Sequence, residues 1–235
     1  MKRNQPNTAF IEFLKNSGVN FFTQNQPNKF FKNNIIEENT VLDSINNIND
    51  LSDYILKSNI CPLKETANRT VISDGNLNSK LMIIGEAPGK DEDIQGIPFV
   101  GKAGQLLNKM LSAINLERKD VYVTNVIPWR PPNNRTPNNE EIMQCLPILQ
   151  KHIEIIKPNY LLLLGATASK AVLSSPLSIF KLRNKWHDYT SIHLDINIKT
   201  LVSYHPAFLL RSPQYKKEAW DDLQLLQKEI SLNAN

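Results

Sequence analysis

From Lys80 onwards, short apolar segments alternate with longer segments whose apolar residues recur at helical spacing. A strand that is buried on both faces of a sheet reads as a nearly continuous apolar run. Strands that alternate with helices are typical of a parallel α/β sheet. We therefore predict an α/β fold, a three-layer sandwich with a central four-stranded parallel sheet flanked by helices. The predicted strands are Leu81–Ile84, Val121–Thr124, Tyr160–Leu164 and Thr200–Ser203.

Two of the connecting segments carry apolar stripes that predict core-facing helices, one over residues 106–114 and one over residues 142–156. The second helix is expected to start near Thr136-Pro137, because a capping residue is followed there by the residue best tolerated in a first turn. It is expected to stop at Lys157-Pro158, since proline cannot continue a helix. The simplest role for both stripes is core packing.

The amino-terminal segment differs from the rest of the chain. It is rich in asparagine and interrupted by Pro6 and Pro27, and only Phe10–Phe22 carries enough apolar residues to predict a short helix. We predict a poorly ordered or partly helical extension over residues 1–50. A chain of 235 residues is long enough for one main domain, which we place at residues 51–235.

Charge and cysteine content restrict the setting only loosely. The 27 Lys and Arg against 23 Asp and Glu give a net charge of +4, which permits a polyanionic partner without identifying one. No apolar run is long enough for a signal peptide or a membrane span, so we expect a cytoplasmic protein without membrane contact. We also expect a monomer. Cys61 and Cys145 lie far apart in such a chain and are expected to be reduced thiols.

Polar segments follow three of the predicted strands. Gly85–Gly89 follows the first strand, Asn125 ends the second, and His205-Pro206 follows the fourth. Ligands of an open parallel sheet bind at the carboxyl ends of its strands, so we expect these segments to converge on one crevice. The glycines and proline of the first segment predict a tight turn that approaches a ligand, with Glu86 as a buried or half-buried carboxylate.

Two nucleotide-binding motifs are excluded for the same glycines. A phosphate loop needs four residues between its glycines and a Ser or Thr after its lysine, whereas three residues intervene here and Asp91 follows Lys90. The dinucleotide fingerprint fails because Gly85 and Gly89 have the wrong spacing and no helix is predicted directly behind them. We therefore exclude a nucleoside triphosphatase and a dinucleotide-dependent enzyme.

Several longer motifs, in the same order along the chain, resemble those of the family-four (type-4) uracil-DNA glycosylases. The resemblance extends from about Cys61 to Leu226 and implies the fold of the uracil-DNA glycosylase superfamily. It also implies DNA repair by base excision, in which the N-glycosidic bond of deoxyuridine in DNA is hydrolysed, uracil is released and an abasic site remains. The motifs are Gly85–Asp93, Gly96–Gly104, Thr124–Val126, Arg130–Pro137 and His205–Arg211.

The resemblance also implies how the base is recognised. A glycosylase must take its base out of the helix into a pocket that stacks on the ring and reads its hydrogen-bonding edge. Phe99 matches the stacking ring, and Asn125 matches the amide that reads the edge, since an amide offers both a donor and an acceptor. The alternatives are a core phenylalanine and a turn residue at a strand end. Gly85, Glu86, Ala87 and His205 complete the expected uracil-binding set.

The resemblance assigns the catalytic roles to two charged or titratable residues. His205 matches the histidine that stabilises negative charge on the departing uracil, although a histidine before proline is also a common structural turn residue. Glu86 is expected to stabilise the oxocarbenium-like sugar and to orient the attacking water. Family-one enzymes carry an aspartate at the point that Ala87 occupies here, so the polar role falls on Glu86.

Other residues of the matching loops are expected to face DNA. Loop cations commonly position phosphates, although each is individually explained as well by a solvated surface charge. Leu209 and Leu210 are candidate wedges for the gap that a flipped base leaves, and packing at the start of a helix accounts for them equally well. The candidate DNA-contacting cations are Lys102, Arg130, Arg135, Arg211, Lys216 and Lys217.

The chain departs from the family at one place. Family-four enzymes usually hold a four-iron four-sulfur cluster on four cysteines, and the matching positions here are Cys61, Lys64, Trp129 and Cys145. A protonated lysine is a poor iron ligand, so we expect no cluster and no other cofactor. Trp129 is expected to fill the space in an apolar plug, with stacking on DNA as its alternative role. A relative that binds nucleic acid without turnover is the alternative function.

Overall fold

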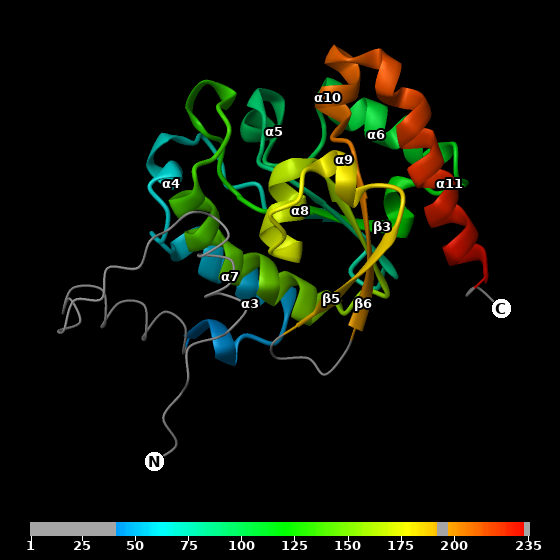
Figure 1. The fold of residues 1–235 in the computed structure, drawn as a ribbon. Helices are drawn as coiled ribbons and strands as arrows, with labels where there is room; N and C mark the ends of the chain where they lie inside the picture. The colour runs from blue at the N-terminus through cyan, green and yellow to red at the C-terminus, as the bar shows by residue number, and fades with distance from the viewer. Residues whose placement is uncertain (1–40, 192–196, 233–235) are drawn as a thin grey trace, which may run out of the picture.

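The computed structural model describes residues 41–191 and 197–232. These residues form a six-stranded sheet in the order β1-β3-β2-β4-β6-β5, with helices on both faces (Figure 1). The strands are β1 (Ser73–Gly75), β2 (Leu81–Gly85), β3 (Val121–Asn125), β4 (Tyr160–Leu164), β5 (Trp186–Thr190) and β6 (Asn197–Ser203). The helices are α3 (Ile48–Lys57), α4 (Leu63–Thr66), α5 (Lys90–Gln95), α6 (Lys102–Ser112), α7 (Asn139–Ile156), α8 (Ala166–Leu173), α9 (Ile179–Leu182), α10 (Pro206–Arg211) and α11 (Lys216–Leu232), with short 3₁₀ turns η1 (Arg118–Asp120), η2 (Pro132–Asn134) and η3 (Pro213–Tyr215).

The four strands predicted from the apolar runs are the central strands β3, β2, β4 and β6, and each neighbouring pair is parallel. Alternate side chains of β2 enter opposite halves of the core. Met82 and Ile84 pack with residues of α3, α7 and α8, whereas Leu81 and Ile83 pack with residues of α6 and α11. The same helices are seen on opposite sides of the sheet (Figure 1). The predicted three-layer α/β fold is confirmed.

The sheet has two further strands that the prediction missed. β1 pairs antiparallel with β3, and β5 pairs antiparallel with β6, so both lie at the edges. β1 has no buried residue, and in β5 only Tyr189 is buried. Strands with so little buried surface lack the apolar run from which the central strands were predicted.

Helix α7 starts two residues later than predicted. Asn138 is its capping residue, and its side-chain oxygen accepts a hydrogen bond from the Glu141 N–H at 2.8 Å. The Glu141 carboxylate accepts in turn from the Asn138 N–H at 2.8 Å, which completes a capping box. This reciprocal pair determines the start, so the prediction at Thr136-Pro137 is wrong. The predicted end is confirmed, because Lys157 is left-handed at φ 49° and Pro158 follows.

Helix α5 corrects a second expectation, since it begins directly behind Gly89. Its first turn holds three acidic residues, which suit the positive end of a helix dipole, and Gly96 ends it in the left-handed conformation. A six-residue helix is too short to show an apolar stripe. The dinucleotide fingerprint still fails on the spacing of its glycines.

The described residues before position 50 belong to the packed structure. Leu42 and Ile45 are 6% and 7% exposed and lie in the same apolar cluster as Leu51 of α3. The division at residue 50 remains a prediction, and the helix predicted over Phe10–Phe22 lies outside the described residues. Within the described residues, no helix is long and apolar enough to cross a membrane.

Candidate active site

The segments that follow β2, β3, β4 and β6 meet at one pocket of about 500 Å³. Helices α5 and α10, which follow β2 and β6, lie at the same end of the sheet (Figure 1). The volume is in the range of sites for small ligands, and the position is that expected for an open parallel sheet. The predicted site residues that line the pocket are Glu86, Ala87, Phe99, Asn125, Arg135, His205 and Arg211.

Gly85 lies behind the side chains of Phe99 and Asn125. It is the register partner of Asn125 in neighbouring strands. A β-carbon at this position would lie 2.4 Å from the Asn125 Oδ1 atom and 2.5 Å from the Phe99 ring. Glycine therefore lets the amide and the ring approach the same strand end, and any side chain here would displace one of them.

Phe99 belongs both to the core and to the pocket. Its side chain is 6% exposed and packs in the apolar cluster on the α6 and α11 side of the sheet. Its ring also lines the pocket, with its centroid 5.5 Å from that of the His205 ring. Most of the Phe99 ring therefore packs in the core, as its alternative role required, and one part of the ring forms the pocket wall.

Glu92 holds the Phe99 loop in place, a role that sequence reasoning missed. Phe99 adopts φ 56°, a left-handed conformation that a side chain of this size rarely takes. The buried Glu92 carboxylate accepts hydrogen bonds from the N–H groups of Gly89, Val100 and Gly101, at 3.1, 3.0 and 2.9 Å. These three bonds tie the two motif loops together and stabilise the conformation that places the ring.

Asn125 presents an unused acceptor at the pocket. The residue is 6% exposed, and its Oδ1 atom is buried with no hydrogen-bond partner among the described residues. A buried amide oxygen without a partner costs free energy, which a bound donor would recover. The unpartnered oxygen therefore favours a ligand-binding amide over a structural turn residue.

His205 lies between β6 and α10 and is half-buried at the pocket. Its Nδ1 atom accepts a hydrogen bond from the Ala207 N–H at 3.2 Å, so the neutral ring carries its proton on Nε2. Burial, with a smaller contribution from the positive charge of Arg211, lowers the pKa of His205 to about 4. At neutral pH the side chain is therefore an uncharged donor.

Glu86 has a partner that the sequence analysis missed. The residue is half-buried, and its carboxylate accepts a hydrogen bond from the hydroxyl of Thr167, which is in the first turn of α8. Gly165, before this helix, also lines the pocket. The rule that drew attention to the ends of the other three strands applies equally to the end of β4, and it would have found this segment.

The cations expected to contact DNA differ in exposure and in their hydrogen-bond partners. Arg211 and Lys102 are exposed. Arg135 makes two hydrogen bonds to the buried Glu141 carboxylate, and this partner raises the pKa of the guanidinium. Arg130 donates to Asn134 at 2.7 Å. Arg135 and Arg130 therefore also hold their own loop. Lys216 and Lys217 are exposed at the start of α11.

The two candidate wedges are distinguished by burial. Leu209 is 1% exposed and packs in the core, so the packing account applies to it and it is not placed to contact DNA. Leu210 is 43% exposed on the same helix. The wedge role therefore remains open to Leu210 alone of the two.

Of the four positions that match cluster ligands, two carry cysteines, Cys61 and Cys145, and two do not. Cys61 and Cys145 are buried, and the hydrogen bond with Cys61, together with burial, raises the pKa of the Cys145 thiol. The Lys64 ammonium donates to the carbonyls of Leu56 and Ser58, both at 2.7 Å. It therefore satisfies carbonyls at the end of α3. Within the described residues, no group of three or more His, Cys, Asp or Glu could hold a metal ion.

Trp129 fills apolar space beside this region. It is 0% exposed, lies in the same apolar cluster as both cysteines, and donates its ring N–H to the Thr70 hydroxyl at 3.1 Å. A ring in this position is not available to stack on DNA. The residues present therefore do not fit a four-cysteine cluster.

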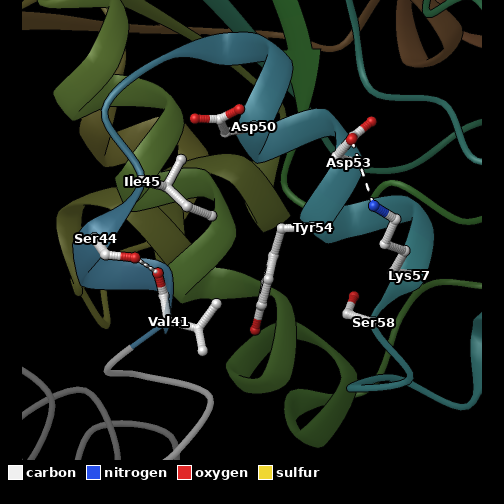
Figure 2. Close-up of a pocket in the computed structure, with 8 residues that line it drawn as sticks. All are labelled: Val41, Ser44, Ile45, Asp50, Asp53, Tyr54, Lys57 and Ser58. Atoms are coloured by element: carbon white, nitrogen blue, oxygen red, sulfur yellow. Dashed lines mark hydrogen bonds and ion pairs between the residues drawn. The ribbon is translucent and has the colours of Figure 1, made fainter.

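A second hollow, of about 510 Å³, is formed by residues 41–58 (Figure 2). Asp53 and Lys57, one turn apart on α3, pair at 3.5 Å on one side of it, and their side chains are 68% and 80% exposed. It contains none of the predicted site residues. Solvated surface charges account for its polar groups.

The fold and the first pocket define an α/β protein with a ligand site at the carboxyl ends of parallel strands. The sequence profile of the Uracil DNA glycosylase superfamily matches residues 72–224. The chain is 40% identical over 177 residues to a type-4 uracil-DNA glycosylase of Pyrobaculum aerophilum, covering 74% of this chain and 90% of the relative. The enzyme of the same name from Archaeoglobus fulgidus is 38% identical over 183 residues, covering 75% and 90%. That from Thermotoga maritima is 40% identical over 163 residues, covering 69% and 82%.

The chain belongs to the uracil-DNA glycosylase superfamily, and within it to the type-4 enzymes.

Proposed function

We propose that the protein hydrolyses the N-glycosidic bond of deoxyuridine in DNA, releasing uracil and leaving an abasic site. The observation that carries this proposal is that Glu86, Phe99, Asn125 and His205 line one pocket. The names of the type-4 relatives support the same activity. A module that only binds nucleic acid has no need for this set of side chains.

Recognition of uracil begins when the base leaves the helix and enters the pocket. The Phe99 ring stacks on the base. The free Oδ1 atom of Asn125 accepts from the N3–H of uracil, and the amide NH₂ donates to O4. Cytosine presents an acceptor at N3 and a donor at N4, so it opposes both groups. Asn125 therefore provides the discrimination.

The reaction breaks the bond between C1′ of the sugar and N1 of uracil. The bonding electrons leave with the base, and the Nε2–H of His205 stabilises the negative charge that develops on uracil O2. The Glu86 carboxylate, oriented by Thr167, stabilises the positive sugar. A water oxygen then bonds to C1′, its proton passes to Glu86 and on to solvent, and the uracil anion takes a proton from solvent.

DNA is proposed to contact the rim of this pocket. Arg211 lines the pocket and is exposed, and Lys102 is exposed next to the lining residue Ala103, so both are suited to phosphates. The hydrogen bonds of Arg130 and Arg135 order the adjacent loop. Leu210 is the candidate wedge. We also propose that the protein works without an iron–sulfur cluster, since Lys64 and Trp129 occupy two ligand positions. The monomeric state and the cytoplasmic location remain predictions.

The test is release of uracil from an oligonucleotide that carries one deoxyuridine. The wild-type chain should release free uracil and leave an alkali-sensitive abasic site, while the double variant Glu86→Ala/His205→Ala should not. An oligonucleotide with cytosine at the same position is the substrate control. Binding of the uracil-containing strand without any release would favour the non-catalytic relative and would contradict the proposal.

A further inference from the structure

Four aromatic side chains form a continuous cluster at one side of the pocket, and none of them was predicted as a site residue. The Tyr204 centroid lies 5.9 Å from that of Phe180, 5.1 Å from that of Phe208 and 5.3 Å from that of Tyr215. Phe180, Tyr204 and Phe208 also line the pocket. We call these four residues the aromatic wall.

Phe180 is the exposed end of the aromatic wall. It is 59% exposed, whereas Tyr204 is 1% exposed and Phe208 and Tyr215 are half-buried. A single exposed phenylalanine is common on protein surfaces. Phe180 differs because it lines the pocket, and because its ring lies next to those of Tyr204 and Tyr215, at 5.9 and 6.1 Å between centroids.

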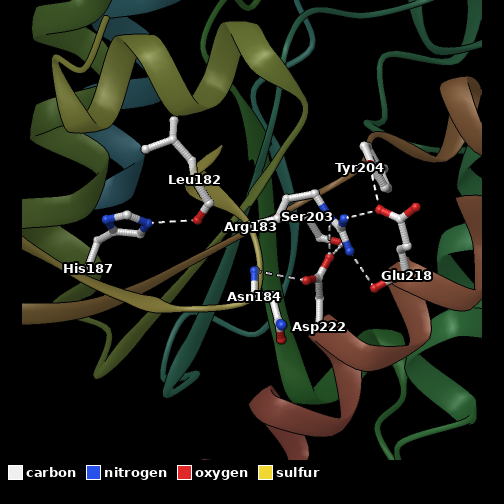
Figure 3. Close-up of polar contacts among 8 residues, drawn as sticks. All are labelled: Leu182, Arg183, Asn184, His187, Ser203, Tyr204, Glu218 and Asp222. Carbon is white, nitrogen blue, oxygen red and sulfur yellow. Dashed lines mark hydrogen bonds and ion pairs between the residues drawn. The ribbon is translucent and has the colours of Figure 1, made fainter. Parts of the chain in front are cut away.

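The segment that carries Phe180 is firmly attached to the rest of the fold (Figure 3). Arg183, at the end of α9, donates to Asp222 at 2.8 Å and to the Glu218 carboxylate at 2.5 Å, both on α11. Its guanidinium also lies 4.0 Å from the centroid of the Tyr204 ring. The Tyr204 hydroxyl donates to Glu218 at 2.8 Å. This network fixes α9 against β6 and α11, so Phe180 is presented on a rigid support.

Exposed cations are present on the same short helix as Phe180 and at the same pocket. Lys181 is the next residue of α9 and is exposed, and the exposed Arg211 lines the same pocket. A flat ring next to cations is the arrangement that binds a base and its phosphates in single-stranded nucleic acid. Sheet-end pockets for small polar ligands need no exposed ring at their rim, so the combination points to the strand that carries the base.

We propose that Phe180 is a stacking platform for the base next to the flipped uracil, and that it favours single-stranded DNA. This inference rests on the proposed glycosylase function. In a duplex, the neighbouring base remains paired with the opposite strand and stacked on its own neighbour. In a single strand no partner holds that base, so it can turn onto the ring of Phe180 while its phosphate meets Lys181.

The test compares Phe180→Ala with wild type on matched single-stranded and duplex DNA, each with one deoxyuridine. Loss of one stacked base should raise KM and the Kd for the single strand by about 5- to 150-fold. The kcat of Phe180→Ala on either substrate, and its KM for the duplex, should stay within about twofold of the wild-type values. Phe180→Trp should restore binding because it keeps a ring. Leu177→Ala, an exposed apolar residue of the same segment outside the pocket, is the matched control.

Two results would overturn the platform: an unchanged KM for the single strand, or a loss on duplex as large as that on the single strand. The second result would make Phe180 a duplex wedge. Binding of a uracil-free single strand, followed by fluorescence anisotropy, separates this inference from the proposed function. A wild-type chain that releases no uracil would refute the glycosylase, whereas the effect of Phe180→Ala on this binding would still decide the platform.

Discussion

The Thr167 hydroxyl donates a hydrogen bond to the Glu86 carboxylate, and so joins the segment after β4 to the segment after β2. Without this bond the carboxylate is free to rotate in a half-buried position. Thr167 does not need to touch the substrate for this purpose, so we regard it as a positioning residue for Glu86.

Thr167→Val, which keeps the shape and removes the hydroxyl, should lower kcat for uracil release by about 10- to 100-fold, because a hydrogen bond to a charged group contributes about 1.5–3 kcal/mol. KM should change little, since binding does not depend on this bond. Thr167→Ser restores the hydroxyl and should recover most of the rate. A melting curve checks that the valine variant is folded, and an equal loss in the serine variant would show that packing is what matters.

Glu86→Ala and His205→Ala should each lower the rate of uracil release by about 10²- to 10³-fold, because both side chains act on charge that develops only in the transition state. Binding of abasic DNA should remain close to wild type. Single-turnover kinetics measure the first effect, and anisotropy the second. Glu140→Ala, an exposed glutamate in the first turn of α7, is the control. Near-normal turnover in either variant would remove that residue from the mechanism.

The pH dependence of the rate reports the charge of His205. Its pKa is lowered to about 4 by burial, so the folded protein keeps the ring neutral above that pH. We expect no inflection near pH 6.5 in kcat, and loss of the neutral donor only as pH falls toward about 4. An inflection at the usual histidine pKa that disappears in His205→Ala would contradict a neutral donor.

The same pKa makes a prediction about stability. Between about pH 4 and the usual histidine pKa of about 6.5, the unfolded chain binds a proton at His205 that the folded chain does not. Titration of His205 should therefore leave the free energy of unfolding independent of pH above about pH 6.5. It should lower the free energy of unfolding as the pH decreases from about 6.5 to about 4. Urea unfolding at a series of pH values measures the slope, which should be shallower in His205→Gln.

Asn125→Asp should lower uracil release by about 10-fold or more, because a carboxylate cannot donate to O4 of uracil and each base-edge pair contributes about 1–3 kcal/mol of discrimination. Parallel assays with uracil and cytosine oligonucleotides measure the change in preference. Asn108→Asp, at an exposed position of α6, adds the same charge away from the pocket. If Asn125→Asp treats uracil as the wild type does, this residue does not read the base.

The central strands could be predicted because their signals are local. The apolar runs of β2, β3 and β4 are buried along their whole length, so they identify themselves in the sequence. The edge strands could not be found in this way, since Ser73–Gly75 is polar and gains its conformation only by pairing with β3. Their register depends on a neighbour that the local sequence does not reveal.

The pocket shows the same distinction between local and distant signals. Glu86, Asn125 and His205 were predicted because they lie at or just after the ends of strands and within motifs that resemble those of the family. The same strand-end rule reaches the segment of Thr167, but the roles of Thr167 and Phe180 depend on contacts across the fold, to Glu86 and Tyr204 respectively. Leu209 and Leu210 are adjacent and chemically identical, so only the packing of α10 decides which one is exposed.

The positions where the family holds its cluster carry two cysteines, a lysine and a tryptophan here. We expect anaerobically purified protein to contain no stoichiometric iron or acid-labile sulfide, to show no brown colour, and still to release uracil. Two thiolates cannot hold a cluster that normally takes four, and the other two positions are a lysine tied to backbone carbonyls and a buried tryptophan. Four iron atoms per chain would refute this expectation whatever the activity.

Trp129 should then stabilise the region that a cluster would otherwise hold. It is fully buried in the apolar cluster that contains Cys61 and Cys145, so Trp129→Ala should lower the free energy of unfolding by about 3–5 kcal/mol. Trp220→Ala, at a position of α11 that is 38% exposed, is the matched control and should change it by less than about 1 kcal/mol. Urea unfolding measures both. A Trp129→Ala chain as stable as wild type but weaker in DNA binding would instead support the stacking role that its burial argues against.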